Sequence, residues 1–130
     1  MLKKFTFLIS IFYTLTLSAL SLFKINDVVE KIPSFNDKAG HAIAHLIFVV
    51  LWFVVFYFKF NLKYNKALGY AALFSLAYGV LIELLQEWVT VSRQSEYNDV
   101  LANALGIVFA LLLLLSIKKR MLKSNNTLLF

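Results

Sequence analysis

Long apolar stretches constrain the fold of this chain more than any other feature. Four of them stand out, at residues 5–23, 42–58, 67–82 and 100–117. A bilayer core of about 30 Å needs about 20 helical residues, with a usable range of about 17–25. The second stretch reaches this length if its helix begins at Asp37, and the third does so if its helix ends at Trp88. The sequence therefore predicts an all-α integral membrane protein with four transmembrane helices in a compact bundle. The predicted helices lie at about residues 5–23, 37–58, 67–88 and 99–117.

Composition agrees with a membrane protein and excludes several other classes. Hydrophobic residues make up 61% of the chain and charged residues 15%, against roughly 45–50% and about 25% in an average soluble domain. A soluble domain of this size could not hide so much apolar surface, so disorder and most soluble enzymes are excluded. Cysteine is absent, which excludes disulfides, thiolate metal sites and Cys nucleophiles. Residues 1–130 are predicted to form one domain.

The first apolar stretch has an alternative interpretation as a signal peptide. Lys3 and Lys4 precede it, and residues 18–21 loosely resemble a cleavage site. The run is longer than a usual signal core, and Leu20 fits the small-residue rule poorly. We therefore favour a transmembrane helix.

Lysine and arginine are unevenly distributed between the two ends of the predicted helices. With four spans, both termini lie on one side of the membrane, which then holds nine cations and no acid. These cations are Lys3, Lys4, Lys59, Lys63, Lys66, Lys118, Lys119, Arg120 and Lys123. The positive-inside rule thus predicts cytoplasmic termini, with residues 118–130 as a cytoplasmic tail of frayed order. The net charge of +6 is then an orientation signal, and we expect no nucleic-acid partner.

Polar residues recur on one face of the second predicted helix, near its outer end. Asp37, His41 and His45 are spaced i, i+4, i+8, which places them on one face over about two turns. They could form a general base, a proton relay or half of a metal site. Alternatively, Asp37 caps the helix and the histidines are hydrogen-bonded packing residues. The histidine spacing is permitted for zinc but common, so we predict no metal and no cofactor.

The third and fourth predicted helices also carry polar residues near their outer ends. These are Glu83, Gln86, Glu87 and Thr90 on the third, and Asp99, Asn103 and Gly106 on the fourth. A charge well inside a spanning helix costs about 2.5–3.5 kcal/mol on insertion scales, and such residues usually face the bundle interior. They could form a functional site or only hydrogen bonds that fix packing. Arg93, in the loop between these helices, has a planar fork suited to carboxylates and phosphates.

In chain order, three of these motifs resemble the VanZ-like family of bacterial membrane proteins. The motifs are Asp37-Lys38-x-x-His41, Glu83-x-x-Gln86 and Arg93-x5-Asp99-x3-Asn103-x2-Gly106. The resemblance covers about residues 37–114, roughly three of the four predicted helices. His45 departs from it, because we would expect an aromatic residue at this position.

The resemblance implies a multi-pass protein of the bacterial cytoplasmic (inner) membrane with a role in the cell envelope. It also suggests a link to glycopeptide resistance of the teicoplanin type. Our first hypothesis is that an outward-facing polar pocket binds a membrane lipid or a lipid-linked cell-wall precursor. The predicted binding residues are Asp37, Lys38, His41, Glu83, Gln86, Arg93, Asp99 and Asn103.

A second hypothesis is a small membrane hydrolase or transferase acting on a lipid-linked substrate in the outer leaflet. The candidate catalytic residues are His41, Glu83 and Asp99. His41 or Glu83 would be the general base, and Arg93 would stabilise developing negative charge. A proton or ion path is disfavoured, because the inner half of the fourth predicted helix is apolar and a path needs polar groups across the full depth.

The binding hypothesis predicts that Arg93→Ala weakens the binding of an anionic lipid, because the guanidinium would hold its phosphate or carboxylate group. Titration of the purified protein with phosphatidylglycerol, and with phosphatidylcholine for comparison, measures this. The matched control is Arg120→Ala, which removes a cation predicted to lie on the other side. Unchanged phosphatidylglycerol binding by Arg93→Ala would count against the hypothesis.

Overall fold

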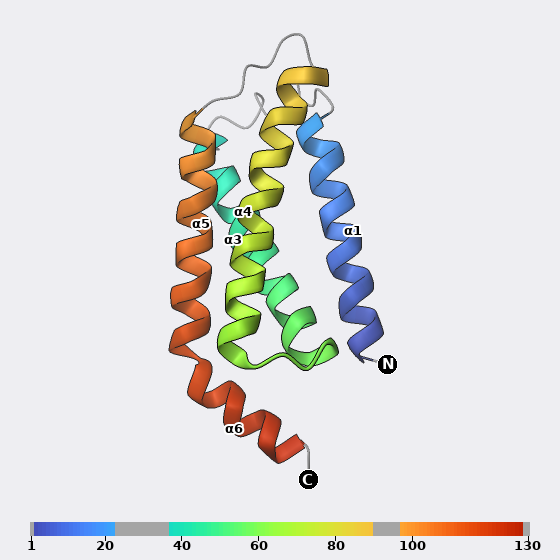
Figure 1. Cartoon of the computed structure of the whole chain (residues 1–130), viewed down its shortest axis with the longest axis vertical. Helices are drawn as coiled ribbons and strands as arrows, with labels where there is room; N and C mark the ends of the chain where they lie inside the picture. The colour runs from blue at the N-terminus through green and yellow to red at the C-terminus, as the bar shows by residue number, and fades with distance from the viewer. Residues whose placement is uncertain (1, 23–36, 90–96, 129–130) are drawn as a thin grey trace.

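The helices of the computed structural model follow the apolar stretches of the sequence (Figure 1). The structure describes residues 2–22, 37–89 and 97–128. Its helices are α1 (Leu2–Leu22), α3 (Asp37–Val54), η1 (Val55–Lys59), α4 (Tyr64–Val89), α5 (Tyr97–Ser116) and α6 (Lys118–Leu128). These described ranges contain no strand, so the predicted all-α class is confirmed.

Four segments are long and apolar enough to cross a membrane. They are Leu2–Leu22, Lys38–Lys59, Tyr64–Trp88 and Tyr97–Ser116. The chain is therefore a multi-pass membrane protein, as the sequence predicts. α1, α4 and α5 each begin a few residues earlier than the hydropathy pattern suggests. Polar residues at a helix start still adopt helical backbone geometry, although a hydropathy pattern excludes them.

The structure differs from the sequence prediction in two places. The end of the second span is a π-helix, η1, which closes with a hydrogen bond of 3.2 Å from the Phe60 N–H to the Val55 carbonyl. Beyond residue 117, where the sequence predicts a frayed tail, α6 continues as a helix. The Met121 N–H donates to the Ile117 carbonyl at 3.0 Å across this junction. Lys, Arg, Met and Leu are good helix formers, which explains a helix where hydropathy shows none.

The spanning helices run alternately up and down, so both chain ends lie at the same end of the bundle (Figure 1). α3 packs against α1, α4 and α5, and its contact with α5 is the most extensive in the bundle. The predicted nine-cation side corresponds to the end that carries the termini. The opposite end brings together the last turns of α1 and α4 with the first turns of α3 and α5.

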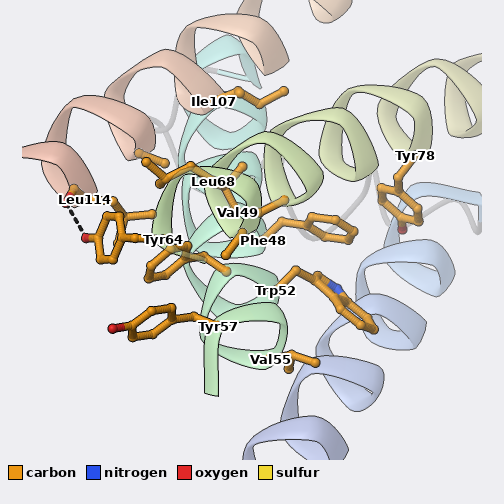
Figure 2. Close-up of a cluster of buried hydrophobic side chains, with 14 of the residues drawn as sticks. Phe48, Val49, Trp52, Val55, Tyr57, Tyr64, Leu68, Tyr78, Ile107 and Leu114 are labelled. Atoms are coloured by element: carbon orange, nitrogen blue, oxygen red, sulfur yellow. Dashed lines mark hydrogen bonds between the residues drawn. The ribbon is translucent and has the colours of Figure 1, made fainter. Parts of the chain in front are cut away.

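Buried side chains between the helices form the apolar core (Figure 2). Phe48 of α3 is fully buried and stacks on Tyr78 of α4, with ring centroids 4.8 Å apart. Nearer the termini, the Tyr64 hydroxyl of α4 donates to the Leu114 carbonyl of α5. An aromatic pair such as Phe48 and Tyr78 contributes about 0.5–1.5 kcal/mol in addition to the free energy gained by burying its surface. These contacts fix the relative positions of α3, α4 and α5.

Hydrogen bonds, more than buried side chains, attach α1 to the other helices. Ser10 is the one buried residue of α1, and its hydroxyl lies 3.4 Å from the Leu51 carbonyl of α3. The Tyr13 hydroxyl donates to the Ala44 carbonyl at 2.7 Å. The outer face of α1 is exposed and apolar, as expected of a helix in contact with lipid. α1 is therefore part of the bundle, in agreement with the transmembrane interpretation.

Two glycines allow the backbones of neighbouring helices to approach closely. At Gly106 of α5, an added Cβ would overlap the Ala42 carbonyl oxygen of α3 and lie 2.8 Å from the carbonyl carbon. At Gly79 of α4, it would lie 2.9 Å from Cε1 of His45 and 3.0 Å from Nδ2 of Asn103. Small residues at helix interfaces in membranes permit such backbone approach. The first contact involves backbone atoms, which cannot move aside as a side chain can.

We expect Gly106→Ala to lower the free energy of unfolding by about 1–3 kcal/mol, the usual cost of an overpacked interior. SDS titration of the detergent-solubilised protein, followed by circular dichroism, measures this. Gly69→Ala is the matched control, since a Cβ there meets nothing within 4 Å. The control should retain its stability or gain slightly, because alanine favours helix over glycine. Equal stability of the two variants would contradict the close α3–α5 contact.

Candidate functional site

Polar side chains from three helices meet at the end of the bundle opposite the termini. They are Lys38 and His41 of α3, Glu83 and Gln86 of α4, and Asp99 and Asn103 of α5. Most of them are buried: Glu83 and Gln86 are 4% exposed, Asn103 is 3% exposed and Asp99 is 8% exposed. The structure thus brings together residues that the sequence places on three separate helices. We call these six residues the polar cluster.

An ion pair links α3 to α5 at the edge of the polar cluster. The Lys38 ammonium donates a hydrogen bond to Oδ1 of Asp99. The Asp99 side chain is 12% exposed and that of Lys38 is 36% exposed, so the carboxylate is buried while the lysine reaches the surface. This pairing offsets much of the cost of burying the carboxylate.

His41 lies between two side chains of α5. Its Nδ1 atom is 3.2 Å from Oδ1 of Asn103, and its Nε2 atom is 3.8 Å from Oδ2 of Asp99. An amide oxygen can only accept a hydrogen bond, so the contact with Asn103 requires a proton on Nδ1. Nε2 is then the ring atom directed toward the carboxylate. The Asp37 side chain lies outside the described set, whereas Asn103 makes a defined contact with His41.

Glu83 completes a compact group with these two residues. One ligand-type atom from each of His41, Glu83 and Asp99 can be chosen so that all three lie within 4.8 Å of one another. The three residues come from α3, α4 and α5, and they are the candidate catalytic residues of the sequence analysis. Chemically, the group can hold a proton or a cation between an imidazole and two carboxylates.

A small cavity of about 20 Å³ lies beside this group. Its lining includes His41, Glu83, Asn103, Gly79 and Tyr78. A cavity of this size holds about one water molecule or one ion. It cannot hold a lipid head group, so a larger ligand would have to bind at the surface of the polar end.

His45 has a partner of its own, distinct from those of His41. Its Nδ1 atom is 2.8 Å from the Ser75 hydroxyl of α4, and its ring stacks on Phe48 with centroids 6.1 Å apart. These contacts agree with the interpretation of His45 as a hydrogen-bonded packing residue. Sequence reasoning missed Ser75. The spacing of Ser75, Gly79 and Glu83 at i, i+4, i+8 could have revealed it.

The polar residues predicted near the outer end of the third helix differ in their burial. Gln86 is buried and donates from Nε2 to the Ser21 carbonyl of α1 at 2.8 Å, which connects the polar cluster to the first helix. Glu87 is exposed. Thr90 and Arg93 fall at positions 90–96, outside the described residues.

These features define a class: a multi-pass α-helical membrane protein with one buried polar cluster at one end of its bundle. The family model of VanZ/LLP1 matches residues 4–119, which is nearly the whole chain. The chain therefore belongs to the VanZ/LLP1 family. The resemblance seen in the sequence is confirmed, and the match extends it to the first helix. No curated protein and no solved structure matches the chain.

The Lys38–Asp99 ion pair can be measured by a double-mutant cycle with Lys38→Met and Asp99→Asn. We expect a coupling free energy of about 1–3 kcal/mol, in the range observed for residues in contact, because each single variant leaves a charge without its partner. Unfolding by SDS titration supplies the free energies. Lys66→Met combined with Asp99→Asn is the control and should be additive, since Lys66 lies in the first turn of α4, at the other end of the bundle. Additivity in the first cycle as well would show that the pair contributes nothing.

Proposed function

We propose that this VanZ/LLP1 protein acts in the bacterial cytoplasmic membrane by binding an anionic, lipid-borne group at its outer surface. The ligand would be a phospholipid or a lipid-linked peptidoglycan precursor. When the protein holds that group, the access of glycopeptide antibiotics of the teicoplanin type to the cell surface would change.

The observation that carries this proposal is the polar cluster itself. Charged side chains inside a spanning helix cost about 2.5–3.5 kcal/mol each on insertion scales and usually mark a functional site. His41, Glu83 and Asp99 lie within 4.8 Å of one another on three helices, whereas the rest of the described core is largely apolar. Packing alone would not need such a concentration of ionisable groups.

Lys38 supports an anionic ligand in particular. Its side chain is partly exposed at the surface of the polar end, so its ammonium can contact a phosphate or carboxylate without leaving Asp99. The cavity beside His41 is too small for a head group, which favours a ligand above the cluster. Arg93 and Asp37 remain predicted contacts of the same ligand. Gln86 and Asn103 would hold the helices that present the charged residues.

The orientation in this proposal follows from the positive-inside rule. The nine cations of the other side lie in the first turns of α1 and α4, at the end of η1, just before α4 and in α6. The polar cluster lies at the opposite end of the bundle. With the cationic end in the cytoplasm, the cluster faces outward.

Hydrolysis or group transfer on a lipid-linked substrate is the second candidate function, and the contacts of His41 favour it. Asn103 holds Nδ1, and Nε2 lies 3.8 Å from a carboxylate oxygen, which is an arrangement suited to general-base activation of water. The substrate would occupy the same surface as the ligand of the binding proposal.

Growth under teicoplanin tests the proposed function, in a deletion strain complemented with the wild-type protein or with Glu83→Gln. The amide is nearly isosteric but cannot ionise. We expect Glu83→Gln to lose protection at equal membrane abundance, because the buried charge itself acts. Glu87→Gln is the matched control, since Glu87 is an exposed acid on the same helix, and it should protect fully.

Each result of this growth assay has a defined meaning. Loss of protection in Glu83→Gln alone supports the proposal and justifies a search for turnover of lipid phosphates and esters. Full protection by Glu83→Gln would limit Glu83 to a packing role. If the wild-type protein gives no protection, the resistance role does not apply to this member of the family.

A further inference from the structure

We propose that His41, Glu83 and Asp99 form a binding site for one divalent cation of the zinc or manganese type. This inference goes beyond the proposed function, because it requires neither a lipid ligand nor an effect on antibiotics. The sequence alone favours no metal, since the spacing of His41 and His45 is permitted for zinc but common. The structure instead groups His41 with carboxylates from two other helices.

The donor atoms are close enough for small side-chain movements to bring them onto one ion. One atom from each residue lies within 4.8 Å of the other two. With bonds of about 2.0–2.1 Å, the ligand atoms of a tetrahedral zinc site lie about 3.3–3.5 Å apart. Nε2 of His41 and Oδ2 of Asp99, at 3.8 Å, are already near that spacing. The third donor atom, from Glu83, would have to move closer by about 1–1.5 Å at most to reach the tetrahedral spacing.

The chemistry of the donors selects the type of ion. Imidazole nitrogen suits transition metals such as zinc and iron, whereas calcium and magnesium prefer oxygen alone. One histidine and two carboxylates thus favour zinc or manganese over calcium. Three protein ligands with an open fourth position are the arrangement that catalytic zinc sites use.

Contacts around the three residues orient them as metal ligands are usually oriented. A ligating histidine generally donates its other ring N–H to a carbonyl or carboxylate. The Nδ1–H of His41 donates to Oδ1 of Asn103, which leaves the lone pair of Nε2 directed toward Asp99. Lys38 holds Oδ1 of Asp99, and Oδ2 is the oxygen that faces His41.

Charge and space at the site also fit a cation. The carboxylates of Glu83 and Asp99 repel each other at this separation. A divalent ion between them would offset that repulsion and would also lie within reach of Nε2 of His41. The cavity of about 20 Å³, which His41 and Glu83 help to line, has room for a water molecule as the remaining ligand.

Metal binding by the purified full-length protein in lipid nanodiscs tests this site directly. The protein is stripped with a chelator and titrated calorimetrically with zinc, manganese and calcium, and metal content is counted by mass spectrometry. Cobalt provides a spectroscopic probe of the coordinating atoms. We expect about one zinc or manganese ion per chain, with calcium at least 10-fold weaker, because imidazole disfavours calcium.

Variants then assign the ligands. His41→Gln, Glu83→Gln and Asp99→Asn should each weaken binding at least 10-fold, since even residues that only support a metal ligand contribute 10- to 100-fold. Glu87→Gln is the matched control and should bind as the wild type does, since Glu87 is an exposed acid on the same helix. Glu83→Gln is the decisive variant, because it leaves the Lys38–Asp99 pair intact and a thermal melt can verify its fold.

Two outcomes would contradict the proposed metal site. The first is no stoichiometric binding by the wild-type protein at millimolar metal, in which case the direct contact of His41 with Asp99 accounts for the geometry. The second is equal binding by wild type and by a folded Glu83→Gln, which would locate the ion elsewhere. Because the titrations contain no antibiotic and no anionic lipid, either failure is distinct from failure of the proposed function.

Discussion

The rest of this structure depends on the contact between the backbones of α3 and α5. Gly106 has no side chain, so α5 lies directly against the Ala42 carbonyl of α3. His41 directly precedes Ala42 on α3, and Asn103 lies about one turn before Gly106 on α5; their side chains meet because the helices are so close. A lipid bilayer supplies no hydrophobic force between helices, so the contact must come from shape and from polar pairing. Both are concentrated in this short segment.

Packing and chemistry are therefore properties of the same residues. The Lys38–Asp99 pair and the His41–Asn103 contact join α3 to α5, and Gly79 lets α4 approach His45 and Asn103. Glu83 lies one turn beyond Gly79 and so reaches the same group. A substitution in the polar cluster will change both stability and function, which is why near-isosteric variants and stability controls are needed.

Hydropathy predicted the four spanning helices because length and charge suffice for that purpose. It could not predict η1, since a π-turn and an α-turn have the same apolar composition, nor α6, whose residues are helical but not apolar. Helical periodicity assigned His41, Glu83 and Asp99 to helix faces. Periodicity within a helix does not determine which faces meet, so the Asn103 contact and the His45–Ser75 bond required the structure.

The hydrogen bonds of α1 determine its position along the axis of the bundle. An apolar helix surrounded by lipid could slide along its axis at little cost, because its outer face meets hydrocarbon at every position. Bonds at different levels of α1 prevent this, among them those from Ser10 to Leu51, from Trp52 to Thr14 and from Gln86 to Ser21. A shift by one residue, about 1.5 Å along the axis together with a rotation of about 100°, would break all three together. The first span is thus locked in a single vertical register, although little of its surface is buried.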